Sequence, residues 1–484
     1  MKNFIKSHLY SLIITAISVL FSAAFTVGLA LTRFLGAGII TIIALVLLAF
    51  SVLVFVLTKN TAKKVRTTIG TILAFIILLA QIISGYYIAV SVAALNQMST
   101  PSAEYAELGV YVRIDDAATE LADTKDYVFG ILETLDRETT NIALEKLGET
   151  FLAAPKTQEF SGIEELLDAL INSKAISAIL INEAFLALLC DTEKGEEDIS
   201  KIREICLIKI ERETANIEEI VPENDGSVFT VYFSGIDTRG RISNRSRSDV
   251  NIIATVNTKT GQVLLVSTPR DYYVPLSISN GIPDKLTHAG VYGIDVSIDT
   301  LKMIYGINID YYFKVNFDGF KNIIDALGGI NVYSNYTFNA GKKFSFVKGS
   351  NFLNGEQALA FARARKQLPE GDQGRGKHQM EVINGVITKI CSPAILANYT
   401  ETLNGISGSF ETSIPYEKIA KLVQNQIKNK TKWRVTSYAV SGTGASKKVY
   451  SLSLKAYVVV PDEQTINKAK DLMNQVRNGS VPNV

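Results

Sequence analysis

Three long apolar runs fill most of the first 95 residues and restrict what this chain can become. They cover residues 9–31, 34–57 and 69–92. A helix needs roughly 20 residues to cross the hydrocarbon core of a bilayer, so each run is long enough. A cleaved signal peptide has one short run, and a buried helical hairpin is disfavoured because no charge interrupts any run. The pattern predicts three transmembrane helices within residues 9–95.

The basic residues around these runs predict their orientation. Lys2 and Lys6 precede the first run, and only Arg33 separates the first from the second. The loop before the third run carries Lys59, Lys63, Lys64 and Arg66. Short basic loops stay in the cytoplasm. We therefore expect a multi-pass cell-membrane protein with cytoplasmic residues 1–8 and an extracellular part that follows the third span.

Overall charge and cysteine content exclude some classes of protein. The 484 residues carry a net charge of +1, which gives no sign of nucleic-acid binding, and the expected topology puts the basic loops outside the cell. The chain has three cysteines, too few for a disulfide framework in so large an exported part. One bridge between Cys190 and Cys206 stays open, and it would leave Cys391 alone.

Composition divides the expected extracellular part in two. Residues 104–215 are rich in Glu, Leu and Ala at helical spacing and contain no cluster of His, Cys or Arg, so we interpret residues 96–220 as a small accessory α/β domain. Pro, Asn, Asp and Gly in residues 221–227 mark a boundary. Beyond it, apolar strands alternate with helices, which predicts a layered α/β/α catalytic domain over residues 221–484. Strands are expected at 228–235, 249–257, 262–268, 310–317, 330–334, 433–440 and 454–460, and helices at 297–305, 317–329, 354–362, 378–390 and 416–427.

Polar residues gather where these strands and helices end. The positions are Asp237, Arg239, Arg241, Arg245, Arg247 and Asp249, then Arg270 and Asp271, then Lys285 and His288, and last Arg363, Arg365, Asp372, Arg375 and Gln379. Ligands of layered α/β folds bind at strand ends, so these loops are expected to converge. Arginine forks suit phosphate or pyrophosphate, and two carboxylates suit Mg²⁺. A solvated arginine-rich surface is the alternative, and residue types alone leave both open.

Several common sites are missing from the sequence. It contains no GxxxxGK[ST] nucleotide loop, no GxSxG nucleophile elbow and no HExxH zinc motif. One of the three histidines, His8, precedes the first apolar run. The other two, His288 and His378, are of a type more often hydrogen-bonded or on the surface than bound to metal. A His-based zinc site is therefore not expected.

Seven segments resemble the LytR-CpsA-Psr family, in the family's order, over residues 229–390. They read GIDTRG, RSRSDVNIIATVN, VSTPRDYYV, KLTHAG, YYFKVNFDGFKNIIDALGGINV, LNGEQALAFARAR and GDQGRGKHQ. Three spans with an accessory domain look like the capsule-associated, CpsA-like branch, as do SYAVSGTGAS and YVVVPDEQT. The resemblance implies a central mixed β-sheet with helices on both sides.

The resemblance also implies a function. Family members move a capsular or other cell-wall glycopolymer from a polyprenyl pyrophosphate carrier to peptidoglycan, form a phosphodiester, and use Mg²⁺, with Mn²⁺ as an alternative ion. The implied partners are the lipid-linked polysaccharide, peptidoglycan, the membrane of a Gram-positive-type envelope and capsule synthesis proteins, but no nucleic acid. Two alternatives stay open: a non-enzymatic sensor or scaffold that controls polymer length, and an outward-facing polyprenyl pyrophosphatase. A transcriptional regulator is disfavoured because the cytoplasmic segments are too short for a DNA-binding fold.

The resemblance assigns roles residue by residue. Asp237 and Asp249 would bind the metal, Arg247, Arg270, Arg363, Arg365 and Arg375 the pyrophosphate, and Lys285 and Gln379 the head group. Asp271 and Asp372 would orient arginines, or one of them would be the general base. His378 stands where the family usually has arginine. Residues two apart on a helix diverge by about 200°, so Arg363 and Arg365 can converge only if the helix ends before them.

Overall fold

The computed structural model describes residues 2–33, 35–60, 63–99, 104–212, 226–237, 242, 245–392, 402 and 405–484. The chain forms two compact units. The first comprises Met1–Thr100, Pro393–Ser407 and Ile414–Lys432, and the second comprises Pro101–Ser392, Gly408–Ser413 and Trp433–Val484. The domain boundary expected near residue 221 lies outside the described residues, as do Arg239 and Arg241.

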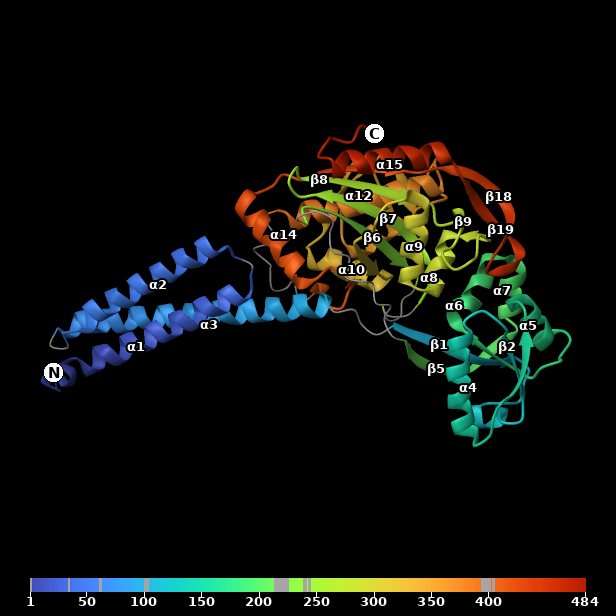
Figure 1. Cartoon of the computed structure of the whole chain (residues 1–484), viewed down its shortest axis with the longest axis horizontal. Helices are drawn as coiled ribbons and strands as arrows, with labels where there is room; N and C mark the ends of the chain where they lie inside the picture. Colours follow the sequence, from blue (N-terminus) through green and yellow to red (C-terminus); the bar gives the residue numbers. More distant parts are fainter. Residues whose placement is uncertain are drawn as a thin grey trace. The chain divides into compact units, whose positions relative to one another are not determined.

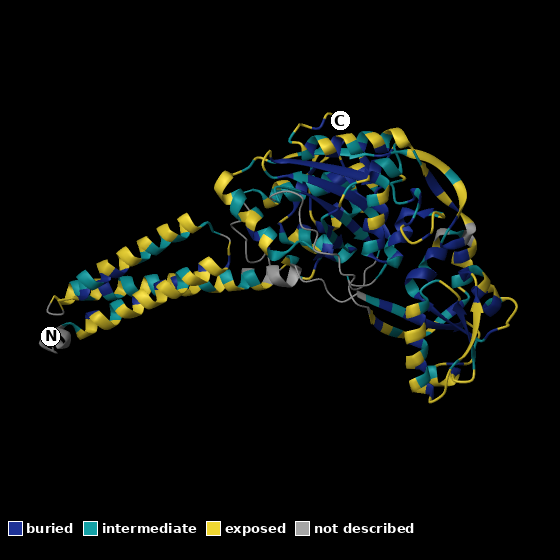
Figure 2. Ribbon diagram, in the orientation of Figure 1, coloured by how far each residue is buried: buried dark blue, intermediate teal, exposed yellow. Residues whose placement is uncertain are grey.

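The first unit contains the three predicted apolar helices, α1 (Lys2–Leu31), α2 (Ala37–Thr58) and α3 (Lys64–Ser99). Each is long and apolar enough to cross a membrane, with a mean hydropathy between 2.2 and 3.2. Most of their apolar side chains are exposed on the outside of the bundle (Figure 2). Polar pairs lie between the helices: Ser11 with Thr58 at 2.8 Å, Ser18 with Ser51 at 3.1 Å, and Gln81 with Ser22 at 2.8 Å. Such hydrogen bonds hold apolar helices together where burial of apolar surface cannot.

Another described helix of this unit comes from much later in the sequence. It is α14 (Tyr416–Asn429), which confirms the helix expected at 416–427 and packs against α3. The Tyr416 hydroxyl donates to the carbonyl oxygen of Thr32, in the connection between α1 and α2, at 2.8 Å. This helix therefore lies beside one end of the apolar bundle.

The second unit begins with a five-stranded sheet in the order β3-β2-β4-β1-β5. Its strands are β1 (Glu104–Arg113), β2 (Val128–Leu132), β3 (Lys156–Phe160), β4 (Ala178–Asn182) and β5 (Ile202–Arg212). Helices α4 (Arg137–Phe151) and α5 (Ile163–Ile171) pack against it, and α6 (Glu183–Leu186) and α7 (Glu193–Ile199) follow. This is the small α/β region that the sequence predicts.

The core of this accessory region continues into the rest of the unit. One cluster of buried residues joins α5 and β4 to Val291, Val449 and Val458. The rings of Phe185 and Tyr292 meet edge to face at 5.2 Å between centroids. The accessory sheet therefore shares a hydrophobic core with the part of the chain that follows it.

That following part is built on a six-stranded sheet in the order β16-β11-β6-β7-β8-β17. The strands are β6 (Val228–Ile236), β7 (Ser248–Asn257), β8 (Gln262–Thr268), β11 (Tyr311–Val315), β16 (Glu411–Thr412) and β17 (Arg434–Ala439). β11 pairs in parallel with β6 and β17 with β8, whereas β7 and β16 pair antiparallel with their neighbours, so the sheet is mixed as expected.

Helices cover both faces of this sheet (Figure 1). Leu264 and Val266 of β8 share a buried cluster with residues of α9 (Ile294–Tyr305) and α15 (Glu463–Arg477). Ser267, the next residue, lies against Gly376 of α12 (Asp372–Ile390). Successive strand residues point to opposite faces, so α12 covers the face opposite α9 and α15. The predicted α/β/α layering is confirmed.

The remaining elements connect this framework. They are β9 (Tyr273–Pro275), β10 (Pro283–Lys285), α8 (Ala289–Tyr292), α10 (Phe317–Ala326), β12 (Ile330–Ser334), β13 (Phe338–Ala340), β14 (Phe344–Phe346), β15 (Gly349–Leu353), α11 (Gly355–Arg363), β18 (Gly442–Val449) and β19 (Leu452–Pro461). The strands expected at 330–334 and 454–460 exist, but they pair with β15 and β18 outside the central sheet. No disulfide joins the three cysteines, so the bridge left open between Cys190 and Cys206 is not formed.

Candidate functional site

A β-bulge presents one of the predicted acidic residues. Gly235 of β6 pairs with Val250 of β7, and Ile236 pairs with Ser248, so Asp249 between them has no partner across the ladder. A bulge bends its strand and redirects the side chain of the extra residue. Asp237 follows β6 directly, so both predicted metal carboxylates lie at the same end of this strand pair.

Arg270, just after β8, is held by carboxylates. Its Nη1 donates to both carboxylate oxygens of Asp249 at 2.9 Å, and the Thr287 hydroxyl donates to the same carboxylate at 3.3 Å. Its Nε lies 3.6 Å from Asp271, and Lys285 Nζ lies 3.3 Å from that same buried carboxylate. Charged hydrogen bonds of this kind fix the plane of a guanidinium group. The Asp249 carboxylate therefore orients Arg270 through hydrogen bonds, and Asp271 lies beside the guanidinium group at ion-pair distance.

The first turns of α12 supply the facing group of charges. Gly371 has a φ of 55°, in the region that favours glycine, and α12 begins at the next residue. Arg375 Nη2 lies 2.6 Å from Asp372 Oδ1, and Arg365 Nε lies 3.3 Å from the same oxygen. Burial lowers the pKa of the Arg375 guanidinium from its ordinary value. Arg375 stays charged, and its burial means that a nearby anion would stabilise it.

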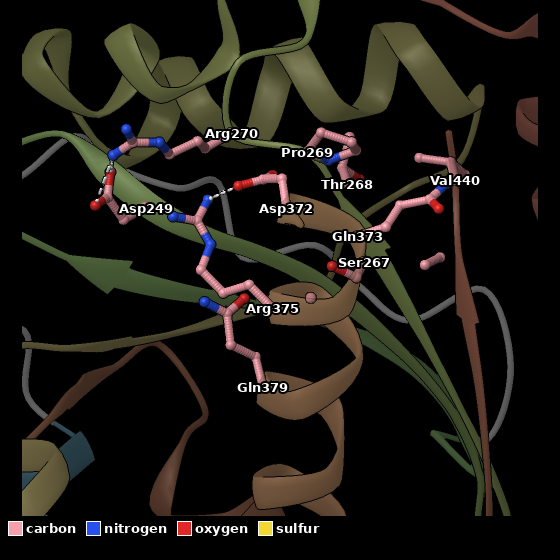
Figure 3. A pocket seen from close by; sticks show the side chains of 12 residues that line it. Asp249, Ser267, Thr268, Pro269, Arg270, Asp372, Gln373, Arg375, Gln379 and Val440 are labelled. Carbon is pink, nitrogen blue, oxygen red and sulfur yellow. Dashed lines mark hydrogen bonds and ion pairs between the residues drawn. The ribbon is translucent and has the colours of Figure 1, made fainter. Parts of the chain in front are cut away.

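These two groups line one pocket (Figure 3). Its lining combines Asp249, Arg270, Asp372, Arg375 and Gln379 with Ser267, Thr268, Pro269, Gln373, Gly376, Ala439 and Val440. The cavity measures ≈ 10 Å³, about the space of one water molecule. Asp249 and Asp372 already neutralise the arginines, so an incoming anion would compete with both carboxylates. Ser267, Thr268 and Gln373 were not predicted as site residues, because their residue types alone do not indicate a site. The position of Ser267 and Thr268 at the end of a predicted strand was the sign in the sequence that could have indicated one.

Other predicted site residues lie outside this lining. Arg247 donates to Asp237 at 2.8 Å. The Arg363 guanidinium lies over the Phe317 ring at 4.4 Å, a cation–π contact. Arg245 donates to the Tyr292 carbonyl oxygen. α11 includes Arg363 and ends there, with a ψ of 127° at Ala364, so the helix does not end before both arginines. Arg363 and Arg365 contact different partners, Phe317 and Asp372.

The two histidines are buried packing residues. His378 packs against both the Phe361 and Phe338 rings, with centroids 3.9 and 5.2 Å away, and its Nδ1 is 3.1 Å from the Phe361 carbonyl oxygen. Burial lowers its pKa to about 4, so it is neutral near pH 7. His288 Nδ1 lies 2.7 Å from the buried Asp284 carboxylate. His378 therefore does not replace the cation that the family usually has at its position.

The donor types at the strand ends suit a hard cation. Asp237 and Asp249 offer carboxylate oxygens only, and Mg²⁺ typically takes one or two carboxylates and fills its other positions with water and phosphate oxygens. Among the described residues no group of three or more His, Cys, Asp or Glu side chains gathers. The donor types of Asp237 and Asp249 therefore fit Mg²⁺, although each carboxylate is paired with an arginine here.

Known proteins resemble this chain over the same region. The sequence profile of the LytR_cpsA_psr family matches residues 197–475. A polyisoprenyl-teichoic acid–peptidoglycan teichoic acid transferase TagU from Enterococcus faecalis is 32% identical over 295 residues, which cover 60% of this chain and 93% of that protein. A protein of the same name from Bacillus anthracis is 35% identical over 219 residues, covering 45% of this chain and 70% of its own.

Solved structures include B. subtilis TagV, which is 28% identical with a TM-score of 0.45 and covers 54% of this chain and 100% of its own. The family profile spans more than half of the sequence, and the Enterococcus relative is matched over nearly its whole length. On these two matches the chain belongs to the LytR_cpsA_psr family.

Proposed function

We propose that this protein transfers a glycopolymer from a polyprenyl pyrophosphate carrier to peptidoglycan. One observation carries the proposal: Arg270 and Arg375 line a single pocket from two distant parts of the sequence, and each is oriented by a carboxylate. Paired guanidinium groups suit the oxygens of a pyrophosphate. The names of the two relatives add the donor and acceptor classes, a polyisoprenyl-linked polymer and peptidoglycan.

The reaction balances as a phosphoryl transfer. A peptidoglycan hydroxyl oxygen attacks the phosphorus that carries the glycan, and a new P–O bond joins polymer to acceptor. The P–O bond to the second phosphate breaks, and polyprenyl phosphate leaves with that electron pair. The hydroxyl proton passes to a base. Charge on the transferring group and the leaving phosphate is what the site must stabilise.

Each charged residue has a role in this proposal. Arg270 and Arg375 bind pyrophosphate oxygens, while Arg365, one ion pair away through Asp372, completes the cationic wall. Gln379 lines the same pocket and would bind the head group. Asp237 and Asp249 would hold Mg²⁺, which would supply positive charge next to the pyrophosphate.

Three further assigned cations have more distant roles. Arg247 positions Asp237, and Lys285 positions Asp271, which lies beside Arg270. Arg363 would reach the polymer's phosphate only by leaving the Phe317 ring.

Of the two candidate bases, Asp372 is better placed. Its carboxylate lines the pocket, whereas Asp271 is buried beside Lys285 and is not part of the lining. A general base must come within hydrogen-bond reach of the acceptor hydroxyl. When pyrophosphate oxygens take over Arg375, Asp372 is released to accept the proton.

The test uses the full chain in liposomes with a radiolabelled glycan on undecaprenyl pyrophosphate and with peptidoglycan as acceptor. We expect label bound to peptidoglycan through an acid-labile phosphodiester, and loss of this product when Mg²⁺ is chelated. Asp249→Asn and Arg270→Lys should abolish the product. No labelled peptidoglycan under any divalent ion would disprove the transferase proposal.

The same assay separates the alternatives. A polyprenyl pyrophosphatase would release glycan phosphate at the same rate with and without peptidoglycan, and a scaffold would consume no carrier. Parallel reactions with a capsular polysaccharide and a teichoic acid on the same carrier would identify the polymer. We favour the capsular donor on the sequence resemblance to the CpsA-like branch. We also propose that the site faces outward, as the basic loops predict, with capsule synthesis proteins as neighbours.

A further inference from the structure

Helix α14 has an apolar stripe that the protein leaves partly uncovered. Tyr416, Ala420, Val423 and Ile427 recur at the helical spacing of one face. Ala420 is buried, but Val423 is 39% and Ile427 49% exposed. Exposed apolar residues in line on one helix indicate a surface that binds something apolar.

The contacts of α14 place it at the end of the apolar bundle. The Tyr416 hydroxyl donates to Thr32 at 2.8 Å, and Glu417 lies 4.0 Å from Arg33. Gln424 lies beside Gly36, since a Cβ at that glycine would be 3.7 Å from its Nε2. These partners belong to the short connection between α1 and α2, whose flanking helices are long enough to span a membrane. A connection between two spanning helices lies at the membrane surface.

The face of α14 opposite the apolar stripe is positively charged, which suits an anionic surface. Lys418, Lys421 and Lys428 lie on that face, and Lys430 and Lys432 follow it, against Glu417 as the only acidic residue of the segment 416–432. An amphipathic helix with lysines on its polar face and apolar residues on the other lies in the headgroup region of a bilayer. Anionic lipids attract such lysines.

We propose that α14 is an interfacial helix that binds the anionic surface of the membrane in which α1–α3 are embedded. Its apolar stripe of Val423 and Ile427 enters the boundary between headgroups and acyl chains, and its lysines contact lipid phosphates. In the sequence α14 lies between β16 and β17, the two edge strands of the central sheet, with only short connections on either side. Lipid binding by α14 would therefore tether both edges of the catalytic sheet to the bilayer. The inference does not depend on the transferase proposal.

A tryptophan scan in the full chain tests this. Trp433 is the only tryptophan, so Trp433→Phe gives a silent background in which Ile427→Trp reports on the apolar stripe and Lys421→Trp on the polar face. Both proteins are reconstituted in vesicles of dibrominated phosphatidylcholine with roughly one-third phosphatidylglycerol. We expect quenching at 427 to exceed quenching at 421 at least about two-fold, because bromine sits at acyl-chain depth.

The remaining outcomes decide against the proposal. Equal quenching at both positions would mean that the apolar stripe lies no deeper among the acyl chains than the polar face. Blue-shifted emission at 427 without quenching would mean that protein rather than lipid covers the stripe. A second arm replaces Lys428 with Glu in the Ile427→Trp protein. Quenching at 427 should fall in anionic vesicles and stay unchanged in neutral ones. If quenching at 427 is the same in anionic and neutral vesicles, with and without Lys428→Glu, α14 does not bind the membrane through anionic lipids.

Discussion

At the scale of single residues, His378 illustrates how environment decides chemistry. The sequence places a histidine where a phosphate-binding cation is usual in the family, and only the packing of Phe338 and Phe361 reveals its role. A neutral imidazole that stacks on Phe361 of α11 stabilises the contact between α11 and α12. Among the described residues, the cations that line the pocket are Arg270 and Arg375, and Arg365 lies one ion pair away through Asp372.

His378 should make the fold sensitive to acid. Its pKa of about 4 in the folded chain is below the value of about 6.5 for an unfolded histidine. The unfolded state therefore binds more protons below pH 6.5, so stability is complete above that pH and is lost as pH falls toward 4. The loss is on the order of 3 kcal/mol at most. Thermal unfolding of the chain in detergent, measured from pH 7.5 to 4.5, should show it.

His378→Phe is the matched control, since it keeps the stacking on Phe361 and removes the titrating group. The melting temperature of this variant should fall less than that of the natural protein over the same pH range. Parallel curves for the two proteins would show that His378 is not buried in its neutral form.

The contribution of Arg375 to transfer should depend on the shape of its side chain as well as on its charge. Arg375→Lys keeps one positive charge but replaces the planar fork with a single ammonium group, which cannot contact two phosphate oxygens at once. We expect kcat/KM for transfer to fall by about 100-fold, or roughly 2.7 kcal/mol. Arg434→Lys, at the exposed start of β17, controls for arginine replacement in general. Equal losses in both variants would contradict the assignment of Arg375 to the site.

At the scale of elements, apolar patterning predicted most of the framework and local composition misled in one place. The predicted positions are confirmed for the three apolar helices and for strands β6, β7, β8, β11 and β17. The length of an apolar run separates a spanning helix from a short buried strand. α12 begins at Asp372, ahead of the predicted start at 378, because three glycines made its first turns read as a loop. The pairing of Asp249 with Arg270 was not predictable, since a bulge in β7 and the end of β8 bring these residues together, whereas Asp372 and Arg375 are only three positions apart on one helix.

Those glycines have a packing role that the sequence does not display. A Cβ at Gly376 would lie 2.6 Å from the Ser267 hydroxyl oxygen of β8, far inside normal contact. Gly376→Ala should therefore push α12 away from the sheet, lower the melting temperature by several degrees and reduce transfer, because Arg375 would move with the helix. Differential scanning calorimetry and the transfer assay measure the two effects.

The clash itself can be relieved. Ser267→Ala removes the hydroxyl oxygen. The new methyl group at position 376 would then lie 3.5 Å from the Cβ of residue 267, which is an ordinary contact. The double variant Gly376→Ala with Ser267→Ala should recover the melting temperature of Ser267→Ala alone. Gly374→Ala should be milder, because its new methyl group comes no closer than 3.0 Å to Leu368 Cδ1 and 3.1 Å to Leu368 Cβ. If the double variant is no more stable than Gly376→Ala, close approach to β8 is not why glycine occupies this position.

At the scale of the whole molecule, the sequence suggested an accessory region separate in composition from the catalytic part. The spacing of apolar residues within each region could not predict the core that the two regions share. That core is made of single apolar residues from elements far apart in the sequence. Phe185 of the accessory region and Tyr292 of the catalytic part are in ring contact at 5.2 Å. Val449 and Leu452, on the hairpin β18–β19, belong to the same cluster. The two regions should therefore stabilise each other.

Hydrogen exchange in two truncation variants tests this mutual stabilisation. Phe185→Ala removes a side chain that is 2% exposed in the shared core, at a cost of about 3–5 kcal/mol. Exchange should accelerate in β1–β4, and also in α8 and the hairpin β18–β19. Phe151→Ala is the matched control, because Phe151 belongs to a second cluster made only of residues between Ala106 and Ile210. Its effect should stay within residues 104–212. If Phe185→Ala also leaves exchange in α8 and β18–β19 unchanged, the accessory region folds independently of the catalytic part.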